Sequence, residues 1–314
     1  MTLSALRQDG KGGGKRALAE ALAALERDPD GKAQQALLDA AWRQPRAHVV
    51  GITGPPGVGK SSLCAALVAA WRGDGKTVGV IAVDPSSKAS GGALLGDRVR
   101  IVHDSADEGS FVRSMAARDR LGGLADQTLA AMVLMRAQFD RVLIETVGVG
   151  QSETDVVGVA DTVVFCVQPG SGDSLQFMKA GIVEIPHLIA VTKADLGAAA
   201  ERARADVAGA LSLGAAGKGD WPLKALAMSS RSGAGMDALL AAIEAHRQHL
   251  AADGRLAVAR HRQSEGWLVE ALRERFGQRG LARLARLGLD TALPAGGQPF
   301  ERLRVLTSAL ETSR

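Results

Sequence analysis

The sequence predicts an α/β fold built on a doubly wound, mostly parallel β-sheet. A glycine-rich stretch at residues 54–61 stands between an apolar strand and a helix, and short apolar strands then alternate with helices to about residue 250. These strands are almost continuously apolar, as expected where both faces of a sheet are covered. Ligands of such sheets bind beyond the carboxyl ends of the strands, and the polar motifs of this sequence follow those ends.

The glycine-rich stretch has the pattern GxxxxGKS of a phosphate-binding loop. Its place between strand-like residues 48–53 and helical residues 62–68 points backbone N–H groups and a positive helix end at one spot. A P-loop NTPase is therefore predicted, with Lys60 on the β- and γ-phosphates and the Ser61 hydroxyl on Mg²⁺. The residues expected to contact nucleotide here are Gly54, Pro55, Pro56, Gly57, Val58, Gly59, Lys60, Ser61 and Ser62.

The remaining elements follow in order. Further strands are expected at residues 77–83, 141–144, 161–167, 187–191 and 223–228, and helices at 124–137, 199–213 and 236–249. Two helical runs, 16–22 and 33–42, precede the sheet, and helices broken by Gly and Pro at 294–299 follow it. We therefore expect an N-terminal helical extension (1–44), a nucleotide-binding domain (45–250) and a C-terminal helical arm (251–314).

Acidic residues follow two of the predicted strands. Asp84 comes directly after residues 77–83. Asp97 lies in the Ser/Gly-rich loop that follows, and this loop can become ordered by contacting the γ-phosphate and Mg²⁺. Glu145 ends another apolar strand in the Walker B arrangement, and Gly148 can offer its N–H to the γ-phosphate. Arg100 can stabilise transition-state charge, or be an exposed loop arginine. The expected catalytic set is Lys60, Asp84, Arg100 and Glu145.

A base-recognition motif follows the strand at residues 187–191. The run Thr192-Lys193-Ala194-Asp195 resembles the motif NKxD, in which the Asp carboxylate accepts from the N1–H and amino group of guanine. Adenine has no such donor pair, so the motif predicts GTP rather than ATP. Thr192 stands in place of Asn, and we expect the side-chain bonding of that Asn to be lost. The base pocket is completed by Ser229, Ser230 and Arg231.

Composition narrows the function classes. Apolar content is 46%, net charge is +4, and neither a bilayer-spanning run nor a secretory signal is found, which favours a cytoplasmic protein with no membrane partner. Cys64 and Cys166 lie in apolar segments and are expected to be buried free thiols. The histidines form no metal-ligand pattern, and His246 and His249 are expected at a solvated helix end. The C-terminal arginines have helical spacing without interleaved aromatics, which favours a solvated or partner-facing surface over nucleic acid.

Taken together, these motifs resemble the MeaB/ArgK family, relatives of the human MMAA protein. Members are SIMIBI-class P-loop GTPases that serve as chaperones of adenosylcobalamin-dependent acyl-CoA mutases. The resemblance covers nearly the whole chain. It rests on residues 54–61, 84–87, 91–98, 113–115 with 121–124, 145–153 and 169–176.

The resemblance implies a magnesium site, a partner and a dimer. Its magnesium ligands map onto Ser61, Asp84, Asp97 and Glu145. A third switch loop that senses the mutase maps onto residues 168–179, with Gln168, Asp173, Gln176 and Lys179 as its marked positions. The C-terminal helices would form a homodimer, and GTP or GDP would be the bound nucleotide. No cobalamin is expected to bind directly, and an adenosyltransferase is a further partner that the resemblance allows.

Three questions stay open at this level. Methylmalonyl-CoA mutase is the default partner, with isobutyryl-CoA and 2-hydroxyisobutyryl-CoA mutases as alternatives. Two other functions compete with the chaperone: a phosphotransferase, which corresponds to an old transport-kinase label in the family, and a nickel-delivery GTPase. The first calls for an acceptor pocket and a base, and the sequence shows no distinct substrate domain, whereas it has the guanine motif and the switch loops. The second calls for a Cys or His cluster, which the sequence lacks. The third question is how tightly guanine is selected with Thr192 in the motif.

Overall fold

The computed structural model describes residues 2–7, 13–85, 107–117, 126–146, 148, 156–170, 186–213, 217–218, 221–294 and 296–312. The strands are β1 (His48–Thr53), β2 (Val78–Pro85), β3 (Ser110–Ala117), β4 (Arg141–Glu145), β5 (Thr162–Val167), β6 (Leu188–Val191), β7 (Gly217–Lys218), β8 (Trp221–Pro222) and β9 (Lys224–Ala227). The helices are α1 (Leu3–Leu6), α2 (Gly13–Arg27), α3 (Lys32–Arg43), α4 (Lys60–Gly73), α5 (Asp126–Gln138), α8 (Ala198–Leu213), α9 (Met236–Ala251), α10 (Arg255–Arg286) and α11 (Pro299–Thr312). Short 3₁₀ turns are η1 (Val156–Gly158), η3 (Ala194–Leu196) and η4 (Ala252–Gly254).

The predicted doubly wound sheet is confirmed. Seven strands pair in the order β3-β2-β4-β1-β5-β6-β9, and each of these pairs is parallel. The chain runs outward in one direction from β1 to β2 and β3, and in the other from β5 to β6 and β9, so β1 lies at the switch point where ligands of such sheets bind. A separate antiparallel pair joins β7 and β8. No helix in the described part of the chain is long and apolar enough to cross a membrane.

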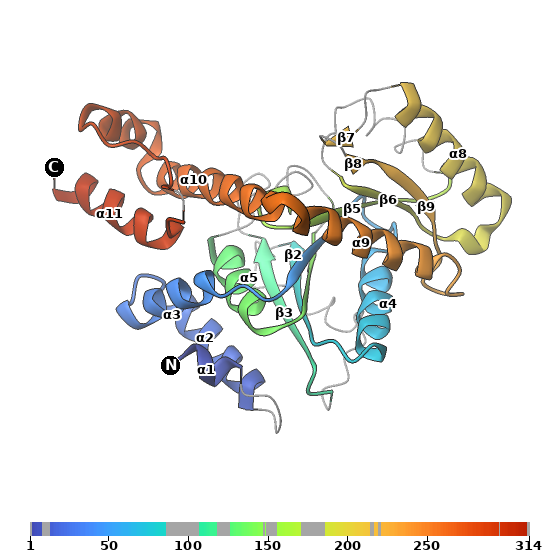
Figure 1. Cartoon of the computed structure of the whole chain (residues 1–314), viewed down its shortest axis with the longest axis horizontal. Coiled ribbons are helices and arrows are strands. Elements are labelled where there is room, and N and C mark those ends of the chain that lie inside the picture. The colour runs from blue at the N-terminus through green and yellow to red at the C-terminus, as the bar shows by residue number, and fades with distance from the viewer. Residues whose placement is uncertain are drawn as a thin grey trace.

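The strands bury side chains on both faces, as their apolar sequences require. In β4, Val142 and Ile144 pack in the core beneath α2, α3 and α5, whereas Leu143 between them packs in the core beneath α4 and α9. Figure 1 shows α5 with the N-terminal helices on one side of the sheet and α4 on the other. Cys64 and Cys166 are both fully buried free thiols in the second core, as the sequence predicts.

Strand β3 was not predicted from the sequence. It lies at the edge of the sheet, and a polar pair, Arg113 and Ser114, interrupts its apolar run. Helix α2 is tied to this part of the sheet, because Arg113 pairs with Glu26 and the Lys15 ammonium donates to the Asp107 carbonyl just before β3. An edge strand bound to a helix is a poor template for pairing with another chain.

The extensions on either side of the sheet pack together. Trp42 of α3 makes an edge contact with Phe300 of α11, and Trp267 of α10 packs on the same ring. Helix α10 is interrupted at Gly277, where φ is 64°, and its second part returns with α11 around a small core of its own. Figure 1 shows α10 crossing the body of the molecule before it pairs with α11. The division at residues 44 and 250 stays a prediction.

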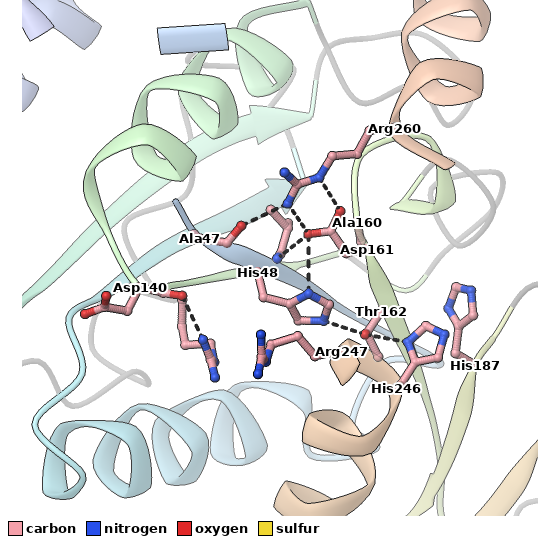
Figure 2. Close-up of polar contacts among 12 residues, drawn as sticks. Ala47, His48, Asp140, Ala160, Asp161, Thr162, His187, His246, Arg247 and Arg260 are labelled. Carbon is pink, nitrogen blue, oxygen red and sulfur yellow. Dashed lines mark hydrogen bonds and ion pairs between the residues drawn. The ribbon is translucent and has the colours of Figure 1, made fainter. Parts of the chain in front are cut away.

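A buried ion pair holds α10 to the amino ends of the central strands (Figure 2). The Arg260 guanidinium donates to both oxygens of Asp161 at 2.8 and 2.7 Å, and to the Ala47 carbonyl at 2.9 Å. The Asp161 side chain is 1% exposed and also accepts from Val49 N. Burial alone would raise the pKa of Asp161, but the hydrogen bonds and charge of Arg260 outweigh it and hold that pKa below its ordinary value.

A chain of polar side chains continues from this pair toward α9. His48 Nε2 and His246 Nδ1 each lie 2.7 Å from the Thr162 hydroxyl, and the ring of His187 packs 4.3 Å from that of His246 (Figure 2). His246 is 1% exposed, so the expectation that it lies at a solvated helix end is wrong. Helix α9 turns this residue inward because its buried face packs on β5 and β6, where Trp221 also covers the ring.

Removing Arg260 should leave the Asp161 carboxylate buried without its main partner. We expect Arg260→Met to lower the free energy of unfolding by about 3–5 kcal/mol at pH 7, which is typical when one member of a buried pair is lost. Urea denaturation would measure the loss. The double variant Arg260→Met/Asp161→Asn should recover part of it, and a loss below about 1 kcal/mol in the single variant would contradict the anchoring role.

Stability should fall in acid in two steps. Burial lowers the pKa of His48 to about 4, against the opposing charge of Asp161, and lowers that of His246 to about 2. The unfolded chain binds protons at these residues near pH 6.5 and the folded chain does not, so stability should decline as pH falls below about 6.5. Asp161 has a depressed pKa, so its contribution is present above about pH 3.9 and is lost at lower pH.

Melting temperatures between pH 7 and 4 would test the first step. His246→Asn should flatten the profile, because one of the two proton-binding differences is removed. The matched change His261→Asn, at a histidine whose side chain is 34% exposed, controls for the loss of an imidazole outside the core. Equal profiles for all three proteins would show that His246 does not set the acid sensitivity.

Candidate functional site

The loop after β1 has the backbone shape of a phosphate cradle. Gly54, Gly57 and Gly59 have φ values of 134°, 74° and 101°, which residues with a Cβ rarely adopt. At Gly54 the chain also passes close to β5, since a Cβ there would lie 2.4 Å from the Cys166 carbonyl oxygen. Helix α4 begins directly after Gly59, so its free N–H groups and positive dipole end face the loop.

Lys60 lies over this loop as predicted. Its side chain reaches back so that Nζ donates to the Gly54 carbonyl at 2.8 Å and to the Pro55 carbonyl at 3.0 Å, and the residue is 7% exposed. The two carbonyls keep the ammonium above the cradle. A phosphate oxygen is a stronger, charged acceptor for the same donor.

Ser61 and Glu145 are brought together. The Ser61 hydroxyl donates to Glu145 Oε1 at 2.6 Å, and Glu145 is 7% exposed at the end of β4, beside β1. Hydroxyl and carboxylate oxygens are the donor set that Mg²⁺ takes, so these two residues fit the predicted ion. Asp84 lies near the end of β2, next to β4, but its side chain is outside the description. Asp97 and Arg100 also fall outside the described residues, and the described ones contain no group of three or more His, Cys, Asp or Glu suited to a metal.

Gly148 is pressed against the phosphate loop. Its φ is 80°, and a Cβ at this position would lie 2.0 Å from the Gly54 carbonyl oxygen and 2.4 Å from Lys60 Nζ. The predicted switch glycine therefore lies at the phosphate loop. A contact that the sequence did not indicate lies nearby: the Thr146 hydroxyl donates to Thr53 Oγ1 at 2.9 Å, joining the ends of β4 and β1.

The predicted base motif lies at the end of β6, on the same edge of the sheet. The Ser229 hydroxyl donates to Asp195 Oδ1 at 2.6 Å, and this bond holds the pKa of Asp195 below its ordinary value. Ser229 Oγ also accepts from the Arg231 backbone N–H, so the loop after β9 is attached to the motif; Ser230 lies between the two. The carboxylate itself is exposed, as an acceptor for a ligand must be.

Two further contacts join the base motif to its neighbours. Thr192 Oγ1 lies 2.7 Å from the Val58 carbonyl, and Lys193 Nζ contacts the side-chain oxygen of Gln168. Thr192 thus makes a side-chain bond of its own to the phosphate loop, although it lacks the amide of the Asn that it replaces. Of the predicted third switch, Gln168 is described; Asp173, Gln176 and Lys179 lie outside the described residues.

These parts define the class. A phosphate-binding loop after β1, an acidic residue at the end of the adjacent β4, and an Asp-containing base motif at the end of β6 are the components of a P-loop GTPase. Comparison with known proteins then gives the family. The chain belongs to the MeaB family, since the family model described as "Methylmalonyl Co-A mutase-associated GTPase MeaB" matches residues 18–284.

Individual relatives agree with this family. The chain is 48% identical over 186 residues to a protein of Pyrococcus horikoshii named as a GTPase, a match that covers 59% of this chain and 58% of that protein. It is 37% identical to the mitochondrial methylmalonic aciduria type A homolog of Mus musculus, covering 74% and 56% of the two chains. It is 34% identical to GTPase ArgK of Escherichia coli, covering 84% and 82%. A solved structure described as LAO/AO transport system kinase is 28% identical with a TM-score of 0.69, covering 98% of this chain and 96% of that one.

The close approach of Gly148 to the phosphate loop can be tested by adding one methyl group. In Gly148→Ala the Cβ would overlap the Gly54 carbonyl and force an unfavourable backbone conformation, with a strain of about 1–3 kcal/mol. We expect GTP hydrolysis to fall about tenfold or more in a phosphate-release assay. Gly75→Ala is the matched control, because Gly75 has φ 73° but no atom within 4 Å of its Cβ position. Equal rates for the two variants would show that the crowding has no role in turnover.

Proposed function

We propose that this protein binds GTP and hydrolyses it to GDP and phosphate, and that it uses this cycle as a chaperone of an adenosylcobalamin-dependent acyl-CoA mutase. The observation that carries the proposal is the meeting of Lys60, the Ser61–Glu145 pair and Gly148 at one edge of the sheet, with the Asp195–Ser229 pair along the same edge. The first group suits a polyphosphate and the second a purine base. Membership of a mutase-associated family supports the choice of partner.

Hydrolysis at such a site depends on positioning and charge more than on covalent chemistry. The backbone N–H groups at the start of α4 and the Lys60 ammonium would hold the phosphates, and Gly148 would offer its N–H to the γ-phosphate. When bound, Mg²⁺ neutralises charge on the phosphate oxygens. The residues proposed to hold it are Ser61, Asp84, Asp97 and Glu145. Arg100 is proposed to add positive charge at the transferred group.

Guanine selection is proposed to rest on Asp195. Its two carboxylate oxygens can accept from the N1–H and the 2-amino group together, and Ser229 fixes the orientation of the carboxylate. Without this charged acceptor, two donors of the base would be left unpaired. A pocket that pairs such donors discriminates strongly against a base that lacks them.

Asp195→Ala should weaken GTP binding on the order of 100-fold and leave the weaker binding of ATP unchanged, because adenine does not offer the same donor pair. Calorimetric titration with GTP and ATP would measure both. Asp195→Asn should shift preference toward xanthosine triphosphate, whose 2-oxo group can accept from an amide. Equal affinity of the unaltered protein for GTP and ATP would refute the guanine assignment.

The proposed output is a change in the mutase. If the partner binds one nucleotide state better than the other, then by linkage the nucleotide alters the affinity for the partner, and cofactor loading can be gated in this way. Methylmalonyl-CoA mutase is the first partner to test, with isobutyryl-CoA and 2-hydroxyisobutyryl-CoA mutases next. The arm formed by α10 and α11 is proposed to join two copies of the chain.

Hydrolysis rates with and without purified mutase would test this output. We expect the mutase to accelerate hydrolysis, and Asp173→Ala and Lys179→Ala to reduce the acceleration while the basal rate is retained. Arg204→Ala is a suitable control, because its pair with Glu201 lies on α8 with 41% and 61% of the two side chains exposed. Full acceleration in both switch variants would contradict the third-switch assignment, and no acceleration by any of the three mutases would contradict the chaperone proposal.

A further inference from the structure

The second part of α10, after its interruption, carries charge of one sign. Residues 278–289 contain three arginines and no Asp, Glu or Lys. Arg279, Arg283 and Arg286 are spaced four and three residues apart, so they lie on one face of the helix. The opposite face packs in the small core of the arm through Leu284. These three residues, named here the arginine stripe, extend about 10 Å along the helix axis.

The arginine stripe differs from its surroundings in having no acidic partner. The other arginines at this end of the arm each pair with a carboxylate: Arg273 with Glu270, Arg275 with Asp30, Arg302 with Asp290 and Arg304 with Asp39. Arg279, Arg283 and Arg286 make no hydrogen bond or ion pair with any residue that the structure describes. Like charges three or four residues apart destabilise a helix, so the folded chain itself gains nothing from this arrangement.

The arginine stripe is open to a second surface. Figure 1 shows the second part of α10 beside α11 at one end of the molecule, with α8 at the other end. Arg279 and Arg286 are exposed, and the exposed residues between them are Ala282 and Ala285. Leu287, which follows the stripe directly, is 44% exposed. The short side chains between the arginines leave the guanidinium groups accessible from outside.

The chemistry of the stripe favours an acidic protein surface over other anionic partners. A guanidinium group pairs with a carboxylate through two parallel hydrogen bonds, and protein interfaces are enriched in Arg and depleted in Lys. A helix that lies on a membrane needs a broad apolar face, and here that face is already buried in the core of the arm. Single-stranded nucleic acid stacks on exposed aromatic side chains, and residues 278–289 contain none.

We propose that the arginine stripe docks on an acidic surface of the partner mutase, whose carboxylates follow one another over about two helical turns. The inference rests on the proposed function, which supplies the mutase as the partner. It is separate from the proposed joining of two copies, because identical stripes brought together at a two-fold axis would repel each other. The stripe therefore adds a contact to the mutase outside the nucleotide site.

Such a contact acts mainly on the encounter of the two proteins. Exposed charges at an interface raise the association rate, and salt screens them. We therefore expect mutase binding to weaken as salt is raised, and this dependence to be smaller when the stripe is removed. GTP binding and hydrolysis by the protein alone should not change, because the stripe belongs to the arm.

The test measures the Kd for purified methylmalonyl-CoA mutase, and for the other two mutases in turn, at low and at physiological salt. Arg279→Gln/Arg286→Gln removes two exposed charges of the stripe, and we expect the Kd at low salt to rise about tenfold, mostly through slower association. Arg202→Gln/Arg262→Gln is the matched control, since these two arginines are also exposed and without a described partner. The control should keep the Kd within about twofold. Melting temperature and basal hydrolysis of both variants should match those of the unaltered protein.

Several results would overturn the inference. One is a Kd within twofold of the unaltered value in the stripe variant, and another is an equal loss in the control variant, which would reflect net charge alone. A lower sedimentation mass of the stripe variant would make the stripe a contact between copies. Binding to phosphatidylserine vesicles or to RNA that is tighter than binding to the mutase, and is lost with the stripe, would assign it to those partners. If the unaltered protein binds none of the three mutases, the chaperone proposal fails and this inference with it, whereas a failure confined to the variants leaves the chaperone proposal standing.

Discussion

The close approach of three backbones at Gly54 is the contact on which the site depends. Its α-carbon faces the Cys166 carbonyl of β5, and its own carbonyl accepts from Lys60 and crowds the α-carbon of Gly148. A side chain at either glycine would separate these segments. The phosphate loop, the end of β4 and the end of β5 can be brought to one point because nothing larger than hydrogen stands between them.

The two ends of the sheet are built in opposite ways. At the carboxyl ends, polar groups such as the Asp195 carboxylate are held in place by neighbouring residues and remain accessible. At the amino ends, Asp161, His48 and His246 are buried and satisfied by Arg260 and Thr162. The pair of Arg260 with Asp161 thus anchors α10 at the opposite end of the strands from the phosphate cradle. This pair therefore does not involve the residues that would contact nucleotide.

Local patterns could be predicted from the sequence, and contacts between distant segments could not. The phosphate loop and its helix form from adjacent residues, so spacing alone placed Lys60 and Ser61. The contact of the Thr192 hydroxyl with the Val58 carbonyl joins residues that are 134 positions apart, so no local pattern could indicate it. His246 was misplaced for the same reason: it sits among polar neighbours on α9, and its burial follows from how that helix packs on Thr162 and Trp221. Strand β3 was missed because an edge strand can carry Arg113 and Ser114 without losing its pairing.

The two buried thiols can report how often the core beside the phosphate site opens. Cys64 lies in the first turns of α4 and Cys166 in β5 behind Gly54; both are fully buried, and burial raises the pKa of Cys166 to about 12 and that of Cys64 well above its ordinary value. A thiol reagent reacts with the exposed thiolate, so neither cysteine can be modified while the core around it stays closed. The rate at which these sulfurs become labelled therefore reports openings of this core, which includes Val58 of the phosphate loop, with no added probe.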